Sequence, residues 1–95
     1  MFLFLFETSY FIHIFFTYIR YKKGGVIARA GHTEASLDLS RLAGLYPAGV
    51  LAEVVNDDGS VMRFEGLKEF SRKHSLVLTS VQDLIAYRYE TEFPV

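Results

Sequence analysis

The chain has 95 residues, of which 51% are hydrophobic, 16% aromatic and 22% charged, which is enough for one small domain and too little for a two-domain enzyme. Its formal net charge of −1 gives no positive surplus for wrapping nucleic acid, so a nucleic-acid-binding role is disfavoured. With no cysteine, the chain cannot form a disulfide scaffold, a cysteine-ligated zinc site, an iron–sulfur cluster or a thiol nucleophile.

Residues 1–23 differ in composition from the rest of the chain. They contain six of the nine phenylalanines and no Ala, Gly, Val, Pro or Asp. Residues 2–19 are long enough to cross a bilayer, and a basic cluster follows them. Glu7 and His13 interrupt the apolar run and count against a membrane span.

Three interpretations of residues 1–23 stay open: a membrane anchor, a buried aromatic segment, and a segment that does not belong to the ancestral protein. A secretory signal is disfavoured because the basic residues follow the apolar run instead of preceding it. The third interpretation is favoured, because Phe, Leu, Ile, Tyr and Lys are the residue types of AT-rich codons, as in translated intron or flanking sequence. We therefore divide the chain at residue 23, with one domain over 24–95.

From Gly24 onward the composition is that of an ordinary α/β protein. Residues 25–30, GVIARA, follow a Gly-Gly turn and predict a short apolar strand. Thr33 is a plausible N-cap for a helix through Ala43, and Gly44 is expected to end that helix at the C′ position. The helix is supported by an apolar stripe at helical spacing: Ala35, Leu39, Leu42 and Ala43.

Residues 49–55, GVLAEVV, alternate and are rich in β-branched side chains, which predicts a strand. The turn residues 56–59, NDDG, separate this strand from SVMRF and predict an antiparallel hairpin. The remaining predicted elements are a helix at 67–73, a strand at 76–79 and a helix opened by a capping box from Ser80 to Asp83. Together these elements predict an α/β fold.

Arg29 to Glu34, RAGHTE, lies where the first predicted strand ends and a helix begins. A helix N-terminus presents unpaired N–H groups and about half a positive charge, which suits a phosphate, and Gly31 would let the backbone approach it closely. Arg29 and the Thr33 hydroxyl add donors, and His32 could bind a divalent metal or move a proton. Taken singly, Thr33 could be only a cap and His32 only a surface imidazole.

The H-x-E spacing of His32 and Glu34 is also found in zinc deaminases. Those enzymes hold zinc with a later pair of cysteines, which this chain lacks, so that chemistry is excluded.

Glu53 lies inside the predicted GVLAEVV strand, between apolar neighbours. On strand periodicity it shares a face with Leu51 and Val55, so its carboxylate is expected to be partly desolvated, as acid–base catalysis requires. The alternative is an edge-strand glutamate that faces water or pairs with a structural arginine. Asp57 and Asp58 are interpreted as turn formers and not as metal ligands. A solvated face is predicted for Arg63, Lys68, Arg72, Lys73 and His74.

A known family shares these motifs. The stretch from residue 29 to residue 59, RAGHTEASLDLSRLAGLYPAGVLAEVVNDDG, closely resembles the C-terminal part of 3,4-dihydroxy-2-butanone 4-phosphate synthase. The preceding GGVIA and the later FSRKHSLVLTSVQDLIAYR fit the same family, so the resemblance covers about residues 24–90. It implies a lyase of riboflavin biosynthesis with a three-layer α/β fold around a mixed sheet, usually a homodimer. Such a lyase converts D-ribulose 5-phosphate to 3,4-dihydroxy-2-butanone 4-phosphate and formate, with Mg²⁺ or Mn²⁺.

The resemblance also implies roles for individual residues. His32 matches the family's metal-ligand histidine, and Glu53 matches a glutamate that contacts substrate and is required for turnover. The substrate-binding positions it implies are Arg29, Ala30, Gly31, His32, Thr33 and Glu53. The implied mechanism is proton abstraction beside a metal-polarised carbonyl, with Glu53 moving protons, followed by dehydration, rearrangement and loss of formate.

Residues 24–95 also depart from the family pattern. The family domain is about twice as long, and its N-terminal half supplies an acidic loop with another metal ligand, which this sequence lacks. A metal held by His32 alone would bind weakly, because Mg²⁺ sites rely on carboxylates and substrate oxygens. We therefore expect a partial synthase domain that is inactive by itself and works as a homodimer or with an intact synthase, in the cytoplasm or a plastid. The alternative is a catalytically dead half domain that binds an intact synthase.

Overall fold

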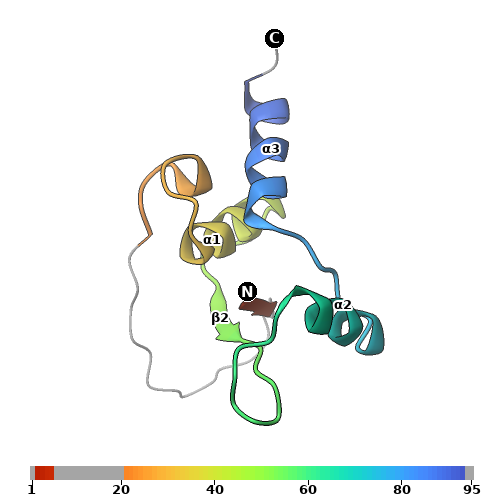
Figure 1. The fold of residues 1–95 in the computed structure, drawn as a ribbon. Coiled ribbons are helices and arrows are strands. Elements are labelled where there is room, and N and C mark those ends of the chain that lie inside the picture. Colours follow the sequence, from red (N-terminus) through yellow and green to blue (C-terminus); the bar gives the residue numbers. More distant parts are fainter. Residues whose placement is uncertain (1, 6–20, 94–95) are drawn as a thin grey trace.

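The computed structural model describes residues 2–5 and 21–93 (Figure 1). The elements in chain order are strand β1 (Phe2–Leu5), 3₁₀ helix η1 (Gly25–Ile27), helix α1 (His32–Leu42), strand β2 (Val50–Glu53), helix α2 (Phe64–Lys73) and helix α3 (Val81–Glu92). Most of the apolar run predicted as a candidate membrane span lies outside the described residues. Within the described ranges, no helix combines the length and apolar character that crossing a bilayer requires.

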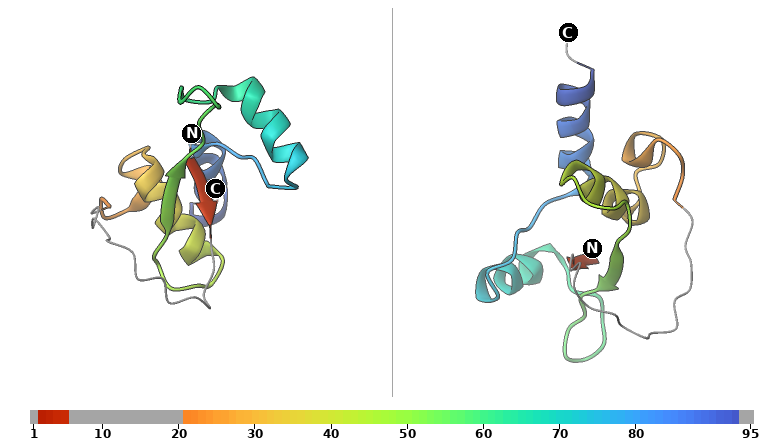
Figure 2. Two further views of the ribbon diagram at one scale, coloured as in Figure 1. Left: turned by 90° about the horizontal axis from the view of Figure 1, so that it is seen from below. Right: turned by 180° about the vertical axis from the view of Figure 1, so that it is seen from behind.

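Helix α1 is the centre of the arrangement. It contacts η1, α3 and β2, and the two views of Figure 2 show α2 lying away from this group. A small apolar cluster of Val26, Ala35 and Leu84 joins η1, α1 and α3. Part of the predicted stripe on α1 is confirmed, because Ala35 is buried in this cluster and Leu39 packs against it. The other part is wrong, since Leu42 and Ala43 are exposed at the end of the helix.

The boundaries of α1 follow local backbone hydrogen bonds. Its N-cap is Gly31, whose carbonyl accepts the Ala35 N–H at 3.0 Å, so the prediction of Thr33 as the N-cap is wrong and Thr33 lies in the first turn. At the other end, Gly44 occupies C′ as predicted and donates its N–H to the Arg41 carbonyl at 3.0 Å. The Leu45 N–H bonds the Ser40 carbonyl at 2.9 Å, which completes a Schellman motif.

Strand β2 confirms part of the predicted strand and lies in a two-stranded sheet. It pairs antiparallel with β1, with Phe2 opposite Glu53 and Leu5 opposite Val50. The turn at 56–59 forms as predicted, and a single antiparallel bridge joins Val55 to Val61, so the hairpin is short. The α/β character is therefore confirmed at a coarse level by helices beside a small sheet.

Residues 25–30 are not a strand. Gly25 has a φ of 68°, and the Val26 N–H donates to Asp38 Oδ2 at 2.9 Å, so this backbone is satisfied by a side chain of α1 and not by a neighbouring strand. A Cβ at Gly25 would lie 2.1 Å from Asp38 Oδ1. Glycine is therefore needed here for both its conformation and its size.

The predicted strand at 76–79 is also absent. Its Leu76 N–H donates to the Ser71 carbonyl at 2.8 Å, and the Val77 side chain is 94% exposed. A strand needs the backbone of a partner, and the described residues place none beside this segment. The flanking helices do form: α2 starts earlier than predicted, at Phe64, and the Ser80 hydroxyl accepts the N–H of Asp83 at 3.0 Å as the capping box predicts.

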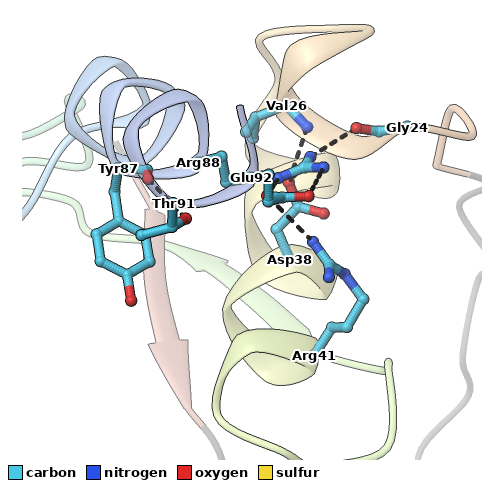
Figure 3. Close-up of polar contacts among 8 residues, drawn as sticks. All are labelled: Gly24, Val26, Asp38, Arg41, Tyr87, Arg88, Thr91 and Glu92. Carbon is cyan, nitrogen blue, oxygen red and sulfur yellow. Dashed lines mark hydrogen bonds and ion pairs between the residues drawn. The ribbon is translucent and has the colours of Figure 1, made fainter. Parts of the chain in front are cut away.

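A buried ion pair fastens α3 to α1 and η1 (Figure 3). Arg88 Nη1 lies 2.9 Å from Asp38 Oδ2 and donates to the Gly24 carbonyl at 2.6 Å, while its other nitrogens bond both carboxylate oxygens of Glu92. The Glu92 hydrogen bonds raise the pKa of Arg88 despite its burial, and Asp38 adds to this effect. Asp38 Oδ2 is shared with the Val26 N–H, so one carboxylate connects three elements.

Arg88→Met is expected to destabilise the chain by about 3–5 kcal/mol, because it keeps the apolar stem but leaves Asp38 buried without its counter-charge. The matched control is Arg72→Met, since Arg72 pairs with Glu69 on an exposed face of α2. That change should alter the free energy of unfolding by no more than about 1 kcal/mol. Urea unfolding followed by circular dichroism measures both, and equal losses in the two variants would contradict a special role for Arg88.

Glu92 gives the fold a predictable response to acid. The Arg88 hydrogen bonds hold the pKa of Glu92 below its ordinary value of 4.5, so their stabilising effect is complete above that value and is lost as the pH falls through the lower, folded pKa. Glu92→Gln should be less stable than the parent at neutral pH and lose less stability between about pH 5 and about pH 3. Glu90→Gln, an exposed change on the same helix, should keep the parental acid dependence in the same unfolding measurement.

Candidate functional site

The turn before α1 is held by a buried glutamate. Glu34 is 0% exposed, and its Oε1 lies 2.6 Å from Arg29 Nη1. Its Oε2 accepts the backbone N–H of Lys22 at 3.1 Å. The Arg29 side chain is 62% exposed, so the guanidinium faces solvent with the carboxylate behind it.

Gly31 makes room for this pair. A Cβ at Gly31 would lie 2.4 Å from Arg29 Nη1 and 2.6 Å from Glu34 Oε1. Its φ of −111° is accessible to any residue, so size and not conformation requires glycine here. The predicted reason for Gly31 was close approach of a phosphate, and the structure adds a second reason inside the protein.

The charge of Glu34 is preserved in spite of its burial. Burial alone would raise the pKa of this carboxyl, but the hydrogen bonds from Arg29 and from the Lys22 N–H outweigh it and hold the pKa below its ordinary value. Glu34 is therefore ionised at neutral pH, and a full negative charge lies beneath the exposed Arg29.

His32 is the first residue of α1 and is partly buried. Its burial lowers the pKa of the imidazole, and the charge of Glu53 acts in the opposite direction. Glu53 stands at the end of β2, and β2 packs against α1, the helix that begins at His32. A neutral imidazole at neutral pH keeps a lone pair for a proton or a metal.

Glu53 is exposed, so the expected partial desolvation of its carboxylate is wrong for this chain. Of the two residues predicted to share its face, Leu51 is half-buried and Val55 is 51% exposed. Among the described elements, β2 has β1 beside it and α1 against it, which leaves this end of the strand open to water. The alternative interpretation, a glutamate that faces water, fits the structure better.

The other predicted positions complete one continuous surface segment. Ala30 is exposed, and Thr33 is half-buried in the first turn of α1 with its carbonyl accepting the Ser36 hydroxyl at 2.9 Å. Arg29 to Thr33 therefore lie together at the N-terminus of an eleven-residue helix, and β2, which ends at Glu53, packs against that helix. Nowhere in residues 2–5 and 21–93 do three or more His, Asp or Glu side chains gather as a group that could hold a metal.

The residues predicted to be structural behave as predicted. Asp58 Oδ1 accepts the N–H of Ser60 at 2.9 Å and its hydroxyl at 2.6 Å, which confirms Asp58 as a turn former. The predicted solvated face is also confirmed, since the following side chains are all exposed: Arg63, Lys68, Arg72, Lys73 and His74.

Sequence reasoning missed the two buried acids of α1. The sequence pattern suggests only zinc chemistry for Glu34, which the lack of cysteine excludes, and it predicts no role for Asp38. A usable signal was present: Glu34, Asp38 and Ala35 fall at helical spacing on one face, and acids beside a buried alanine need buried donors. Those donors prove to be Arg29 and Arg88.

Comparisons with known proteins agree on one family. The family model described as 3,4-dihydroxy-2-butanone 4-phosphate synthase matches residues 13–87, and so begins within the segment 1–23. The riboflavin biosynthesis protein RibBA of Salinispora arenicola is 60% identical over 74 residues, which cover 78% of this chain and 18% of that protein. The monofunctional riboflavin biosynthesis protein RIBA 2, chloroplastic, of Arabidopsis thaliana is 54% identical over 74 residues, covering 78% of this chain and 16% of that protein.

A solved structure supports the same relationship at the level of the fold. The crystal structure of 3,4-dihydroxy-2-butanone 4-phosphate synthase in complex with two magnesium ions matches with a TM-score of 0.71 and 33% sequence identity. The match covers 80% of this chain and 40% of that one. The present chain thus spans less than a fifth of the two named sequence relatives and less than half of the solved structure.

Gly31→Ala is expected to separate Arg29 from Glu34, because the new methyl group would occupy the space of their contact. The exposed guanidinium can swing into water, so we expect a loss of about 1–2 kcal/mol in the free energy of unfolding and not loss of the fold. Ala30→Ser, at an exposed neighbouring position, is the control and should leave urea unfolding unchanged. A Gly31→Ala chain as stable as the parent would show that the contact has no energetic role.

Proposed function

Because the chain belongs to the 3,4-dihydroxy-2-butanone 4-phosphate synthase family, we propose that residues 24–95 are the C-terminal portion of a three-layer synthase domain and carry part of its active site. The proposed reaction converts D-ribulose 5-phosphate to 3,4-dihydroxy-2-butanone 4-phosphate and formate in riboflavin biosynthesis. One observation carries this proposal: the Arg29–Thr33 segment, including His32, lies at the N-terminus of α1, and β2, which ends at Glu53, packs against that same helix.

Each residue has a proposed part in this reaction. Arg29 and the first N–H groups of α1 bind the substrate phosphate. The backbone of Ala30 and Gly31 and the hydroxyl of Thr33 surround the same phosphate. His32, whose burial favours the neutral imidazole, would hold a divalent metal through its lone pair. Glu53, exposed at the end of β2, takes up and returns protons on the sugar.

The metal is proposed to be Mg²⁺ or Mn²⁺, and the solved relative that contains two magnesium ions supports this. His32 fits as one ligand, but the described residues do not supply a group of three, so further ligands must come from outside them. A bound divalent ion would stabilise the oxygen anion that forms when a proton is removed beside a carbonyl.

The chain by itself is proposed to be incomplete. It spans less than half of the solved synthase, and its candidate metal ligands are too few for a firm site. We therefore propose that it works as a homodimer or with an intact synthase. Its compartment is proposed to be the cytoplasm, or a plastid as for the Arabidopsis relative named chloroplastic.

A second candidate function is a half domain that binds an intact synthase without doing chemistry. This candidate is favoured by apolar side chains left on the surface around the hairpin and α2, namely Val50, Val55, Val61, Phe64 and Val77, each more than half exposed. Only four apolar side chains in the described residues are buried, so much apolar surface is left for a partner to cover.

The test is formate production from D-ribulose 5-phosphate with Mg²⁺, measured with formate dehydrogenase. The purified chain is expected to give none, whereas mixing it with the portion of the solved synthase that it does not match should give turnover. In that mixture, His32→Ala and Glu53→Gln should each lower the rate by about 100-fold or more. His74→Ala is the control, because His74 is exposed on the solvated face, and it should leave the rate unchanged.

The two candidate functions differ in the outcome of this mixture. Turnover that depends on His32 and Glu53 supports the enzyme. Tight binding to intact synthase that survives both substitutions, with no gain in formate, supports the non-catalytic half domain. Formate from the chain alone would contradict the proposed incompleteness.

A further inference from the structure

We propose that Glu34 is a positioning residue that holds the Arg29 guanidinium in place for the substrate phosphate. This inference rests on the proposed function, because it takes Arg29 as the phosphate ligand. Glu34 does not touch the substrate in this proposal, and it acts only through Arg29.

The contacts of Glu34 restrain the segment that precedes α1. Its side chain is fully buried, and both carboxylate oxygens are used, Oε1 by Arg29 and Oε2 by the backbone N–H of Lys22. One carboxylate on the first turn of α1 therefore fixes two points of the segment that leads into the turn. A surface pair could not fix the segment in this way, because exposed side chains exchange their partners for water.

The Arg29 guanidinium is held by Glu34 and is still exposed to solvent, as a phosphate-binding group must be. One guanidinium nitrogen, Nη1, is bound to Glu34 at 2.6 Å, while 62% of the side chain is exposed. A guanidinium has five N–H donors in a planar fork, so a contact at one corner still leaves donors for a bidentate phosphate bond. The missing Cβ of Gly31 lets the guanidinium lie close to the start of α1, where backbone N–H groups also suit an anion.

Positioning and simple electrostatics predict opposite effects when the charge of Glu34 is removed. A negative charge beneath an anion site repels the anion, so on Coulomb's law alone Glu34→Gln should bind phosphate more tightly. If Glu34 instead fixes the guanidinium, the same change should bind phosphate more weakly, because the freed arginine must be ordered when the ligand binds.

The experiment titrates the 95-residue chain with inorganic phosphate and then with D-ribulose 5-phosphate, following backbone amide shifts by NMR. Glu34→Gln is expected to lower the affinity for both ligands about tenfold. Glu65→Gln is the matched control: Glu65 lies in the first turn of α2 with its side chain 84% exposed, and this change should leave both affinities within about twofold.

Two further variants separate positioning from a purely structural role. In an Arg29→Gln background, Glu34→Gln should cause no additional loss of affinity, whereas damage to the fold would add a loss there as well. If Glu34→Gln does not fold, Gly31→Ala tests the same point, because its methyl group would separate Arg29 from Glu34 while both charges stay in place. That chain should bind phosphate about tenfold more weakly.

The outcomes are distinct for the two proposals. A parent chain that binds phosphate, with Glu34→Gln binding equally or more tightly, overturns the positioning role and leaves the proposed function standing. A parent chain that binds neither phosphate nor D-ribulose 5-phosphate overturns the phosphate site itself, and the positioning role with it. A Gly31→Ala chain with parental affinity also overturns the positioning role.

Discussion

The buried ion pair between Arg88 and Asp38 is the interaction on which the rest of the described structure depends. It joins residues fifty positions apart, and the same guanidinium reaches the Gly24 carbonyl, sixty-four positions away. The apolar cluster that joins the same elements is small, so these polar contacts have a large share in fixing α3 and η1 on α1. Buried ion pairs add little net stability, but their directional geometry allows few alternative arrangements. By fixing η1 against α1, this pair also fixes the position of the residues that directly precede the Arg29–Thr33 segment.

Glu34 repeats the same design one turn earlier on α1. Both acids are buried on the helix face that also carries Ala35, and each accepts one backbone N–H from the preceding segment and one arginine donor. The two arginines differ in exposure, since the Arg88 side chain is 9% exposed and that of Arg29 is 62% exposed. The buried carboxylate of Asp38 therefore joins elements inside the protein, whereas that of Glu34 supports a cation that faces solvent.

The sequence alone predicted the features that short-range signals determine. The end of α1 at Gly44, the turn around Asp58 and the cap at Ser80 each depend on a hydrogen bond within a few residues, and each is found. The predicted strands at 25–30 and 76–79 fail because a strand depends on a distant backbone, which the pattern of its own side chains does not specify. The contiguous part of the candidate site could be predicted for the same reason, whereas the exposure of Glu53 and the support of Arg29 by Glu34 depend on tertiary contacts.

The exposure of Glu53 and the apolar surface of the hairpin have a common physical explanation. Strand β2 carries Val50 and Glu53 into solvent, and the turn that follows leaves Val55 and Val61 half exposed, although β-branched side chains on a strand stabilise a fold mainly by packing. The solved synthase that matches this fold is more than twice as long as the matched region. A layer packed over β2 would bury these valines and, by the same contact, desolvate the Glu53 carboxylate. In the part of the chain that the structure describes, β2 has β1 beside it and α1 against it, so the exposed valines and the exposed Glu53 have one cause: this end of the strand is not covered by a further element.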